Sequence, residues 1–256
     1  MVHTQYELAK LFYRMHESDP TVVNFLDFTN WGPWAGASLQ HPHSQRSVQT
    51  FTDAPVHLAE AERSRRYFLD TGRNMFDDII KHEIEDGRRV IFENGDVVIL
   101  SEFCPKFEGQ FVVIPRADFS HVLQMDHDAR ERVIVPALGA INATYFYRGQ
   151  PNLNTAWHHA PFGEMDGSRR YYRTHMHVYP RPSKDVSHGR GSGSLVKDAG
   201  AEVGFGIDVL GEFPETSTRQ LRRWYEGDHP SRDRVFDSGG SDDRLKREFD
   251  EFLARR

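Results

Sequence analysis

Apolar residues recur at helical spacing in two stretches of the chain, and each stretch is followed by a short segment expected to be a strand. In Leu8 to His16 and in His127 to Tyr147 the apolar positions fall on one side of a helix. The segments that follow are Thr21 to Phe28, which is rich in β-branched and aromatic residues, and Asn152 to His158. The pattern therefore predicts the order helix then strand at two places.

A hairpin and a further strand lie between these two units. Arg89 to Leu100 contains two apolar runs around Asn94-Gly95, a dipeptide that strongly indicates a two-residue hairpin turn. Gly109 to Pro115 is the further strand. The other predicted elements are the helices Glu60 to Leu69, Met75 to Ile84, Thr216 to Tyr225 and Arg244 to Arg256, the strands Tyr172 to Tyr179 and Glu202 to Leu210, and a glycine-rich loop, Ser187 to Ser194.

A histidine-bearing segment follows both helix–strand pairs, so the chain contains an internal repeat. It is His41 to Gln45 in the first copy and Tyr172 to Tyr179 in the second. The hairpin precedes only the second copy, so we expect the first to be truncated. The predicted fold class is α+β, with two repeats of antiparallel sheet plus helix. The expected organisation is a partial first repeat at 1–58, a linker at 59–85, a complete second repeat at 86–225 and a polar tail at 226–256.

Composition excludes several classes of protein. The 256 residues carry a formal net charge of −6, which provides no basic surface for nucleic acid or an anionic membrane. No apolar run is long enough to span a bilayer. The single cysteine, Cys104, excludes an intrachain disulfide framework and is expected to be a buried small residue. Because Met1 to Leu11 lacks a secretory signal pattern, we expect a cytoplasmic protein.

The 14 histidines are the unusual feature of the composition, and the sharpest motif among them is His41-Pro42-His43-Ser44-Gln45. On a strand His41 and His43 share a face, because side chains alternate with a period of two. A neutral imidazole is a competent nucleophile toward phosphorus and would form a phospho-histidine intermediate. Gln45 lies on the same face and would hydrogen-bond a phosphoryl oxygen. The alternative is a polar loop that happens to hold two histidines.

The residues around this motif resemble a known family. Phe28 to Gln40 leads directly into it and resembles the active-site signature of the galactose-1-phosphate uridylyltransferases, the two-repeat branch of the histidine-triad superfamily. The matching positions are Phe28, Asn30, Gly32, Gly36, Ala37, Ser38, His41, Pro42, His43, Ser44 and Gln45. The segments 156–161 and 175–181 are similar to two later family blocks, and 70–80 and 199–206 match more weakly. The resemblance extends from about Leu8 to Trp224.

The resemblance implies roles for individual residues. His43 would carry the nucleoside monophosphate, Gln45 and Ser38 would contact the phosphates, and Asn30 would help to place the nucleotide. Backbone N–H groups of the loop around Gly36, a second glycine-rich loop, would stabilise the negative charge on the phosphoryl group. Glu202 resembles an acid that holds sugar hydroxyls.

A metal site is also implied. His158, His175 and His177, with Glu60 as carboxylate and Glu62 in reserve, match a family site for zinc or iron. In the alternative interpretation, His175 and His177 merely line a buried strand face. His41 supports a second zinc site in the family, but here it has no cysteine partner, so one metal site is expected. His159, next to His158, is expected to face solvent.

The chain departs from the family pattern at the start of the first repeat, where family members carry further strands and hairpins before the helix. The shortened sheet would leave an open edge, and a homodimer would cover it. Three functions remain open: a nucleotidyltransferase acting on a nucleoside diphosphate-sugar and a sugar 1-phosphate, a nucleotide or nucleotide-sugar hydrolase or phosphorylase that uses the same histidine, and a non-catalytic nucleotide-binding paralogue. In each case the expected partner is a nucleotide or nucleotide-sugar, with no nucleic acid and no membrane.

Overall fold

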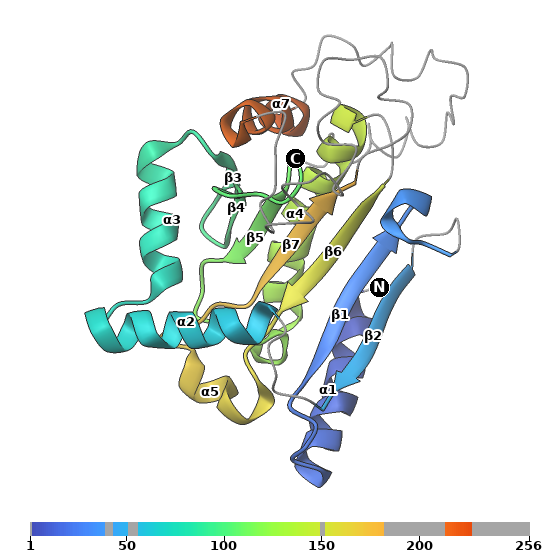
Figure 1. Cartoon of the computed structure of the whole chain (residues 1–256), viewed down its shortest axis with the longest axis vertical. Helices are drawn as coiled ribbons and strands as arrows, with labels where there is room; N and C mark the ends of the chain where they lie inside the picture. Colours follow the sequence, from blue (N-terminus) through green and yellow to red (C-terminus); the bar gives the residue numbers. More distant parts are fainter. Residues whose placement is uncertain (1, 39–42, 51–55, 149–151, 182–212, 227–256) are drawn as a thin grey trace, which may run out of the picture.

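The computed structural model describes residues 2–38, 43–50, 56–148, 152–181 and 213–226. Within them the chain forms one antiparallel sheet in the order β2-β1-β6-β7-β5-β4-β3, with helices on both faces (Figure 1). The strands are β1 (Asn24–Trp31), β2 (His43–Gln49), β3 (Val90–Glu93), β4 (Val97–Ser101), β5 (Phe111–Pro115), β6 (Leu153–His158) and β7 (His175–Pro180). The predicted α+β class with an antiparallel sheet is confirmed.

The helices are α1 (Val2–Ser18), α2 (Val56–Thr71), α3 (Met75–Asp86), α4 (His127–Arg148), α5 (Met165–Ser168) and α7 (Pro214–Glu226), with short 3₁₀ turns η1 (Pro33–Ala35), η2 (Val122–Gln124) and η3 (Phe162–Glu164). Four of the predicted helices, α2, α3, α4 and α7, agree closely with the structure, whereas α1 begins well before its predicted start at Leu8 and α5 was not predicted. Local signals explain their ends: Asn74 caps α3 through a bond from the Phe76 amide, and Gly87 ends it in the left-handed conformation. No helix in the described ranges is long and apolar enough to cross a bilayer.

The two copies of the predicted repeat meet at the centre of the sheet. The units α1-β1-β2 and α4-β6-β7 have the same order of elements, and β1 pairs antiparallel with β6. The paired stretch runs from Asp27, opposite Trp157, to Trp31, opposite Leu153, and Thr29 and Thr155 form the pair at its centre. Both units therefore contribute to one continuous sheet, and the domain limits drawn from the sequence stay a prediction.

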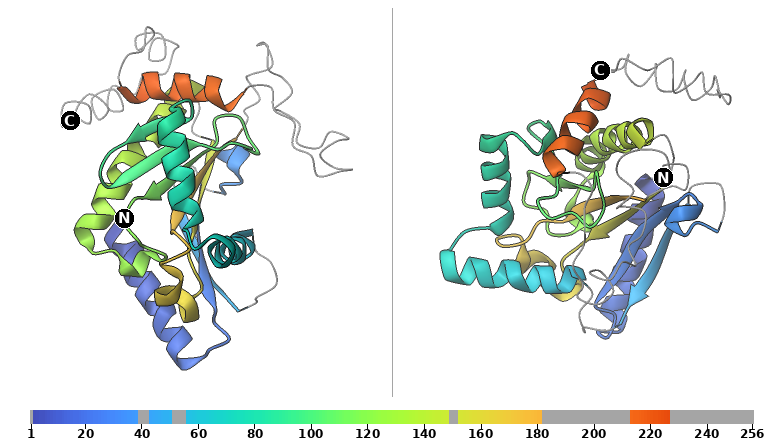
Figure 2. Two further views of the ribbon diagram at one scale, coloured as in Figure 1. Left: turned by 90° about the vertical axis from the view of Figure 1, so that its left-hand side faces the viewer. Right: turned by 45° about the horizontal axis from the view of Figure 1, so that its top comes forward.

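One face of the sheet packs against α4 and α7. Met176 and Val178 of β7 are buried there, against Val133 and Ala137 of α4 and Leu221 of α7. Because side chains alternate along a strand, burial of Met176 and Val178 on this face directs His175 and His177 to the other. The left view of Figure 2 shows α4 on one side of the sheet and α2 on the other.

The second face is covered in its outer half by the segment that connects the repeats. Phe76 and Ile80 of α3 and Ala61 of α2 pack against Val98 and Val112 of the sheet. This packing places α2 beside β6 and β7, where Glu60 of α2 contacts His158 and His175.

Two expectations about single residues are wrong. His159 is only 1% exposed, because the face opposite His158 is covered as well: Phe25 and Trp157 pack against its ring, and its Nδ1 lies 2.7 Å from the Thr174 hydroxyl. Cys104 is exposed, because it lies in the loop after β4 rather than in the core. The predicted glycine-rich loop at 187–194 and the elements at 202–210 and 244–256 lie outside the described residues.

Candidate active site and metal site

His43 is the first residue of β2 and lies directly opposite Asn30 of β1. Asn30 in turn lies opposite Asn154 of β6. Directly paired residues in antiparallel strands project from the same face, and so do residues two apart along one strand. His43, Asn30, Gln45 and Asn154 therefore share the face that carries His175 and His177.

A chain of side-chain amides connects these residues. The Asn154 amide nitrogen donates to Oδ1 of Asn30 at 2.7 Å, and the Asn30 amide nitrogen donates to Oε1 of Gln45 at 3.1 Å. Because the Gln45 oxygen accepts this bond, the NH₂ group of Gln45 is the part of its side chain that can donate a hydrogen bond. Asn154 was not identified from the sequence, because only the β1–β6 register brings it beside Asn30.

The loop after β1 depends on two glycines in an unusual conformation. Gly32 has φ 88° and Gly36 has φ 78°, on either side of η1. A Cβ on Gly36 would meet nothing within 4 Å, so the left-handed backbone itself is the reason for glycine there. Ser38 is exposed at the end of this loop. The predicted site residues His41 and Glu202 lie outside the described residues.

Glu60 of α2, His158 of β6 and His175 and His177 of β7 form a compact cluster. One ligand atom from each lies within 4.8 Å of the others, and no second group of this kind occurs in the described part of the chain. Oε2 of Glu60 lies 2.9 Å from Nδ1 of His158 and 3.2 Å from Nε2 of His175. The structure thus gathers the four residues that the resemblance implied, whereas Glu62 is exposed and pairs with Arg65 and Arg66.

The charges in this cluster suit a metal ion. Burial opposes ionisation of Glu60, but His175 and His158 outweigh it and hold the pKa of the carboxyl well below its ordinary value. Burial lowers the pKa of His158 to about 3, so its imidazole is neutral near pH 7. Burial also opposes the charge on His175, yet Glu60 raises the pKa of this residue. A carboxylate and three imidazoles at this spacing are a fitting donor set for zinc or ferrous iron.

Two further groups orient the histidines. Oε1 of Glu102 lies 2.6 Å from Nδ1 of His177, and the carbonyl of Arg173 lies 2.9 Å from Nδ1 of His175. Both contacts leave Nε2 directed into the cluster, where the two Nε2 atoms are 3.1 Å apart. Glu102 follows β4 directly and carries no local signal, so sequence reasoning missed it.

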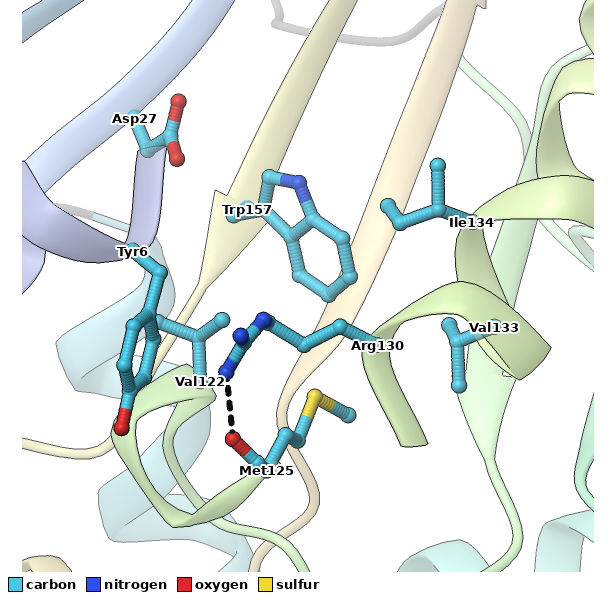
Figure 3. A pocket seen from close by; sticks show the side chains of 8 residues that line it. All are labelled: Tyr6, Asp27, Val122, Met125, Arg130, Val133, Ile134 and Trp157. Carbon is cyan, nitrogen blue, oxygen red and sulfur yellow. Dashed lines mark hydrogen bonds between the residues drawn. The ribbon is translucent and has the colours of Figure 1, made fainter. Parts of the chain in front are cut away.

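Two hollows adjoin the opposite face of the sheet, beneath α4. The smaller, of about 20 Å³, has room for about one water molecule. Figure 3 shows Arg130 in it, donating to the Met125 carbonyl at 2.6 Å and lying over the Tyr6 ring. The larger, of about 310 Å³, is a mostly apolar groove whose lining includes Trp31, Leu138 and Trp157 and also His43. Asn30, Gln45 and Asn154 lie on the other face.

Comparison with known proteins agrees with this arrangement. No protein-family model matches the chain. A galactose-1-phosphate uridylyltransferase of Streptomyces lividans is 26% identical over 152 residues, which are 57% of this chain and 42% of that protein. A solved uridylyltransferase structure superposes with a TM-score of 0.73 at 22% identity, covering 89% of this chain and 69% of the other. An Arabidopsis thaliana ADP-glucose phosphorylase with bound ADP-glucose gives 0.69 at 19% identity, covering 87% and 66%.

The fold, with its paired helix–strand–strand units in one antiparallel sheet, is the fold of the solved uridylyltransferase structure. In sequence, the chain is similar to galactose-1-phosphate uridylyltransferases, and a second one, from Thermotoga maritima, is 26% identical over 199 residues, which are 76% of this chain and 58% of that protein. The chain spans about half the length of the curated relatives it matches.

Proposed function

We propose that this protein is a nucleotidyltransferase that takes a nucleoside monophosphate from a nucleoside diphosphate-sugar and passes it to a sugar 1-phosphate through His43. The observation that carries the proposal is the position of His43 on one sheet face with Gln45 and Asn30, beside the glycine-rich loop at the end of β1. Similarity to galactose-1-phosphate uridylyltransferases supports the same chemistry.

In the first step the lone pair of the His43 imidazole attacks the α-phosphorus. A P–N bond forms, and the P–O bond to the β-phosphate breaks, which releases the sugar 1-phosphate with the bonding electrons. In the second step an oxygen of the incoming sugar 1-phosphate attacks the same phosphorus, and the imidazole leaves. The Gln45 amide, the Ser38 hydroxyl and the backbone amides of the loop around Gly36 would stabilise the charge on the phosphoryl oxygens.

We propose that Glu60, His158, His175 and His177 hold one zinc or iron ion. A bound ion would cross-link α2 to β6 and β7 and stabilise the connecting segment against the sheet. The chain's own groups prepare the site: Glu102 orients His177, and the low pKa of His158 keeps its lone pair available. The predicted homodimer and cytoplasmic location belong to this proposal as well.

A phosphorylase is the second candidate. The fold matches the ADP-glucose phosphorylase of Arabidopsis thaliana nearly as well as the uridylyltransferase structure. Such an enzyme would use the same nucleotidyl-His43, with inorganic phosphate as the acceptor. With water as the acceptor, it would be a hydrolase.

The test is the intact mass of the protein after incubation with UDP-glucose or ADP-glucose and denaturation at alkaline pH, where a phospho-histidine survives. We expect the mass to rise by one nucleoside monophosphate in the wild type and in His127→Asn, an exposed histidine on α4. We expect no rise in His43→Asn. Discharge of the adduct by galactose 1-phosphate, by inorganic phosphate or by water alone distinguishes the three reactions. A wild type that gains no mass and consumes neither nucleotide-sugar would leave the non-catalytic paralogue.

A further inference from the structure

Asn154 belongs to the second repeat, but its side chain contacts the first. It is half-buried on β6, and its amide nitrogen donates two hydrogen bonds, to Oδ1 of Asn30 at 2.7 Å and to the carbonyl of Ala35 at 2.8 Å. An amide NH₂ has two hydrogens, so both donors of Asn154 are engaged. These donors therefore serve other parts of the protein and are not offered to a ligand.

The bond to Asn30 determines how the next amide is oriented. With its oxygen turned to Asn154, the Asn30 side chain turns its nitrogen to Gln45, 3.1 Å away. Gln45 must then present its oxygen to Asn30 and keep its NH₂ group for a phosphoryl oxygen. Without the Asn154 donor, either amide can rotate by half a turn, and Gln45 would offer an oxygen that repels phosphate.

The bond to Ala35 holds the glycine-rich loop at the same time. Ala35 lies in η1, between the two glycines with positive φ. Asn152, two residues before Asn154, accepts a hydrogen bond from the Trp34 amide at 3.1 Å. Asn152 and Asn154 therefore both support the loop, and of these two residues Asn154 also contacts Asn30, which is bonded to Gln45.

We propose that Asn154 is a positioning residue for nucleotidyl transfer. Through one side chain it orients the Gln45 amide and sets the distance between the glycine-rich loop and β2, so that both are in place when the α-phosphate reaches His43. This inference rests on the proposed function, because it assumes that Gln45 contacts phosphate. Asn154, a residue of the second repeat, would thus have a role in the catalytic site around His43, which belongs to the first repeat.

The first measurement is the rate at which the nucleotidyl-His43 adduct forms with UDP-glucose or ADP-glucose. Asn154→Leu keeps the branched shape of the side chain but removes both donors, and we expect the rate to fall about 10- to 100-fold, the scale of effect of a small misplacement of reacting groups. Asn154→Ser keeps one donor and should lie between the two. Asn142→Leu, a half-buried asparagine of α4 on the opposite face, is the matched control and should leave the rate unchanged.

A double-mutant cycle with Gln45→Ala separates positioning from a loss of structure. If Asn154 acts through Gln45, the further loss caused by Asn154→Leu in the Gln45→Ala background should shrink to about threefold or less. An equal loss in both backgrounds would overturn the proposal, as would an unchanged rate in folded Asn154→Leu.

The outcome also separates this inference from the proposed function. If the wild type binds the nucleotide-sugar without forming an adduct, the proposed covalent chemistry is wrong. The double-mutant cycle of Asn154→Leu and Gln45→Ala can then be measured on the dissociation constant of the nucleotide-sugar by calorimetry, and it still decides the role of Asn154. A wild type that neither binds nor reacts overturns both.

Discussion

His158 of β6 and His175 of β7 are direct partners in the sheet, and both lie within 3.2 Å of the same carboxylate oxygen of Glu60. Glu60 precedes His158 by 98 positions and His175 by 115 positions. Spacing along the chain therefore does not indicate that these residues meet. Here the α2 helix delivers Glu60 to the point where β6 and β7 present the imidazoles. A metal ion bound there would hold three elements together.

We therefore expect the purified protein to contain close to one equivalent of zinc or iron per chain, measured by elemental mass spectrometry. Glu60→Gln removes the charged ligand from the buried cluster and should lose most of the metal. Glu62→Gln, on the same helix but exposed, should retain it. Chelation should lower the melting temperature of the wild type, because a ligand that binds only the folded state stabilises it. Equal metal content in the two variants would rule out this site.

Glu102 should tune the metal affinity through His177. Glu102→Gln weakens the acceptor for the His177 ring N–H, and loss of such a partner typically costs about 10- to 100-fold in metal affinity. Competition with a chromophoric chelator measures the change. Glu93→Gln, an exposed carboxylate on β3, is the control and should have the affinity of the wild type. A Glu102→Gln protein with unaltered affinity would show that the contact does not orient His177.

His121 should make the protein sensitive to acid. Complete burial lowers the pKa of His121 to about 3, below the ordinary value. Between these two pKa values the unfolded chain therefore binds a proton at His121 and the folded chain does not. The contribution of neutral His121 to stability is present above its pKa in the unfolded chain and is lost as the pH falls from about 6.5 toward 3. Between pH 6.5 and pH 5 the loss from this group is about 2 kcal/mol, since one pKa unit corresponds to about 1.4 kcal/mol.

Urea unfolding at several pH values of the wild type and His121→Asn tests this expectation. The asparagine oxygen can still accept from the Leu123 amide, as Nδ1 of His121 does at 3.1 Å, but it does not titrate. The variant should lose less free energy of unfolding between pH 6.5 and pH 5 than the wild type. Parallel pH profiles would mean that His121 is not the group responsible.

A side chain at Gly36 should destabilise the protein even though space is available for one. Gly36→Ala forces a residue with a Cβ to adopt φ 78°, which costs about 1 kcal/mol. Gly95→Ala introduces a Cβ that also meets nothing within 4 Å, but at a φ outside the strained range, and should cost much less. Urea denaturation compares the two. Similar losses in both would show that the backbone conformation of Gly36 is not the reason for glycine.

Much of the local structure follows from the sequence. The helices, the Asn94-Gly95 hairpin and the central strands depend on neighbouring residues, and their patterns predict them within a few positions. The His41 to Gln45 motif also predicts a nucleophile and a phosphate-binding amide from a short segment. The resemblance supplied the four candidate metal ligands, since neither periodicity nor spacing relates Glu60 to His158.

The tertiary structure decided which side chains share a face and which are covered. Asn154 meets Asn30 only because β1 and β6 pair with this register, and Glu102 meets His177 only because the end of β4 lies near β7. His159 is buried because both faces of the sheet are covered, which alternation along one strand cannot reveal. The sequence by itself determined the elements and the chemistry they carry, because these depend on near neighbours. The contacts that orient that chemistry depend on strand register and packing between distant segments.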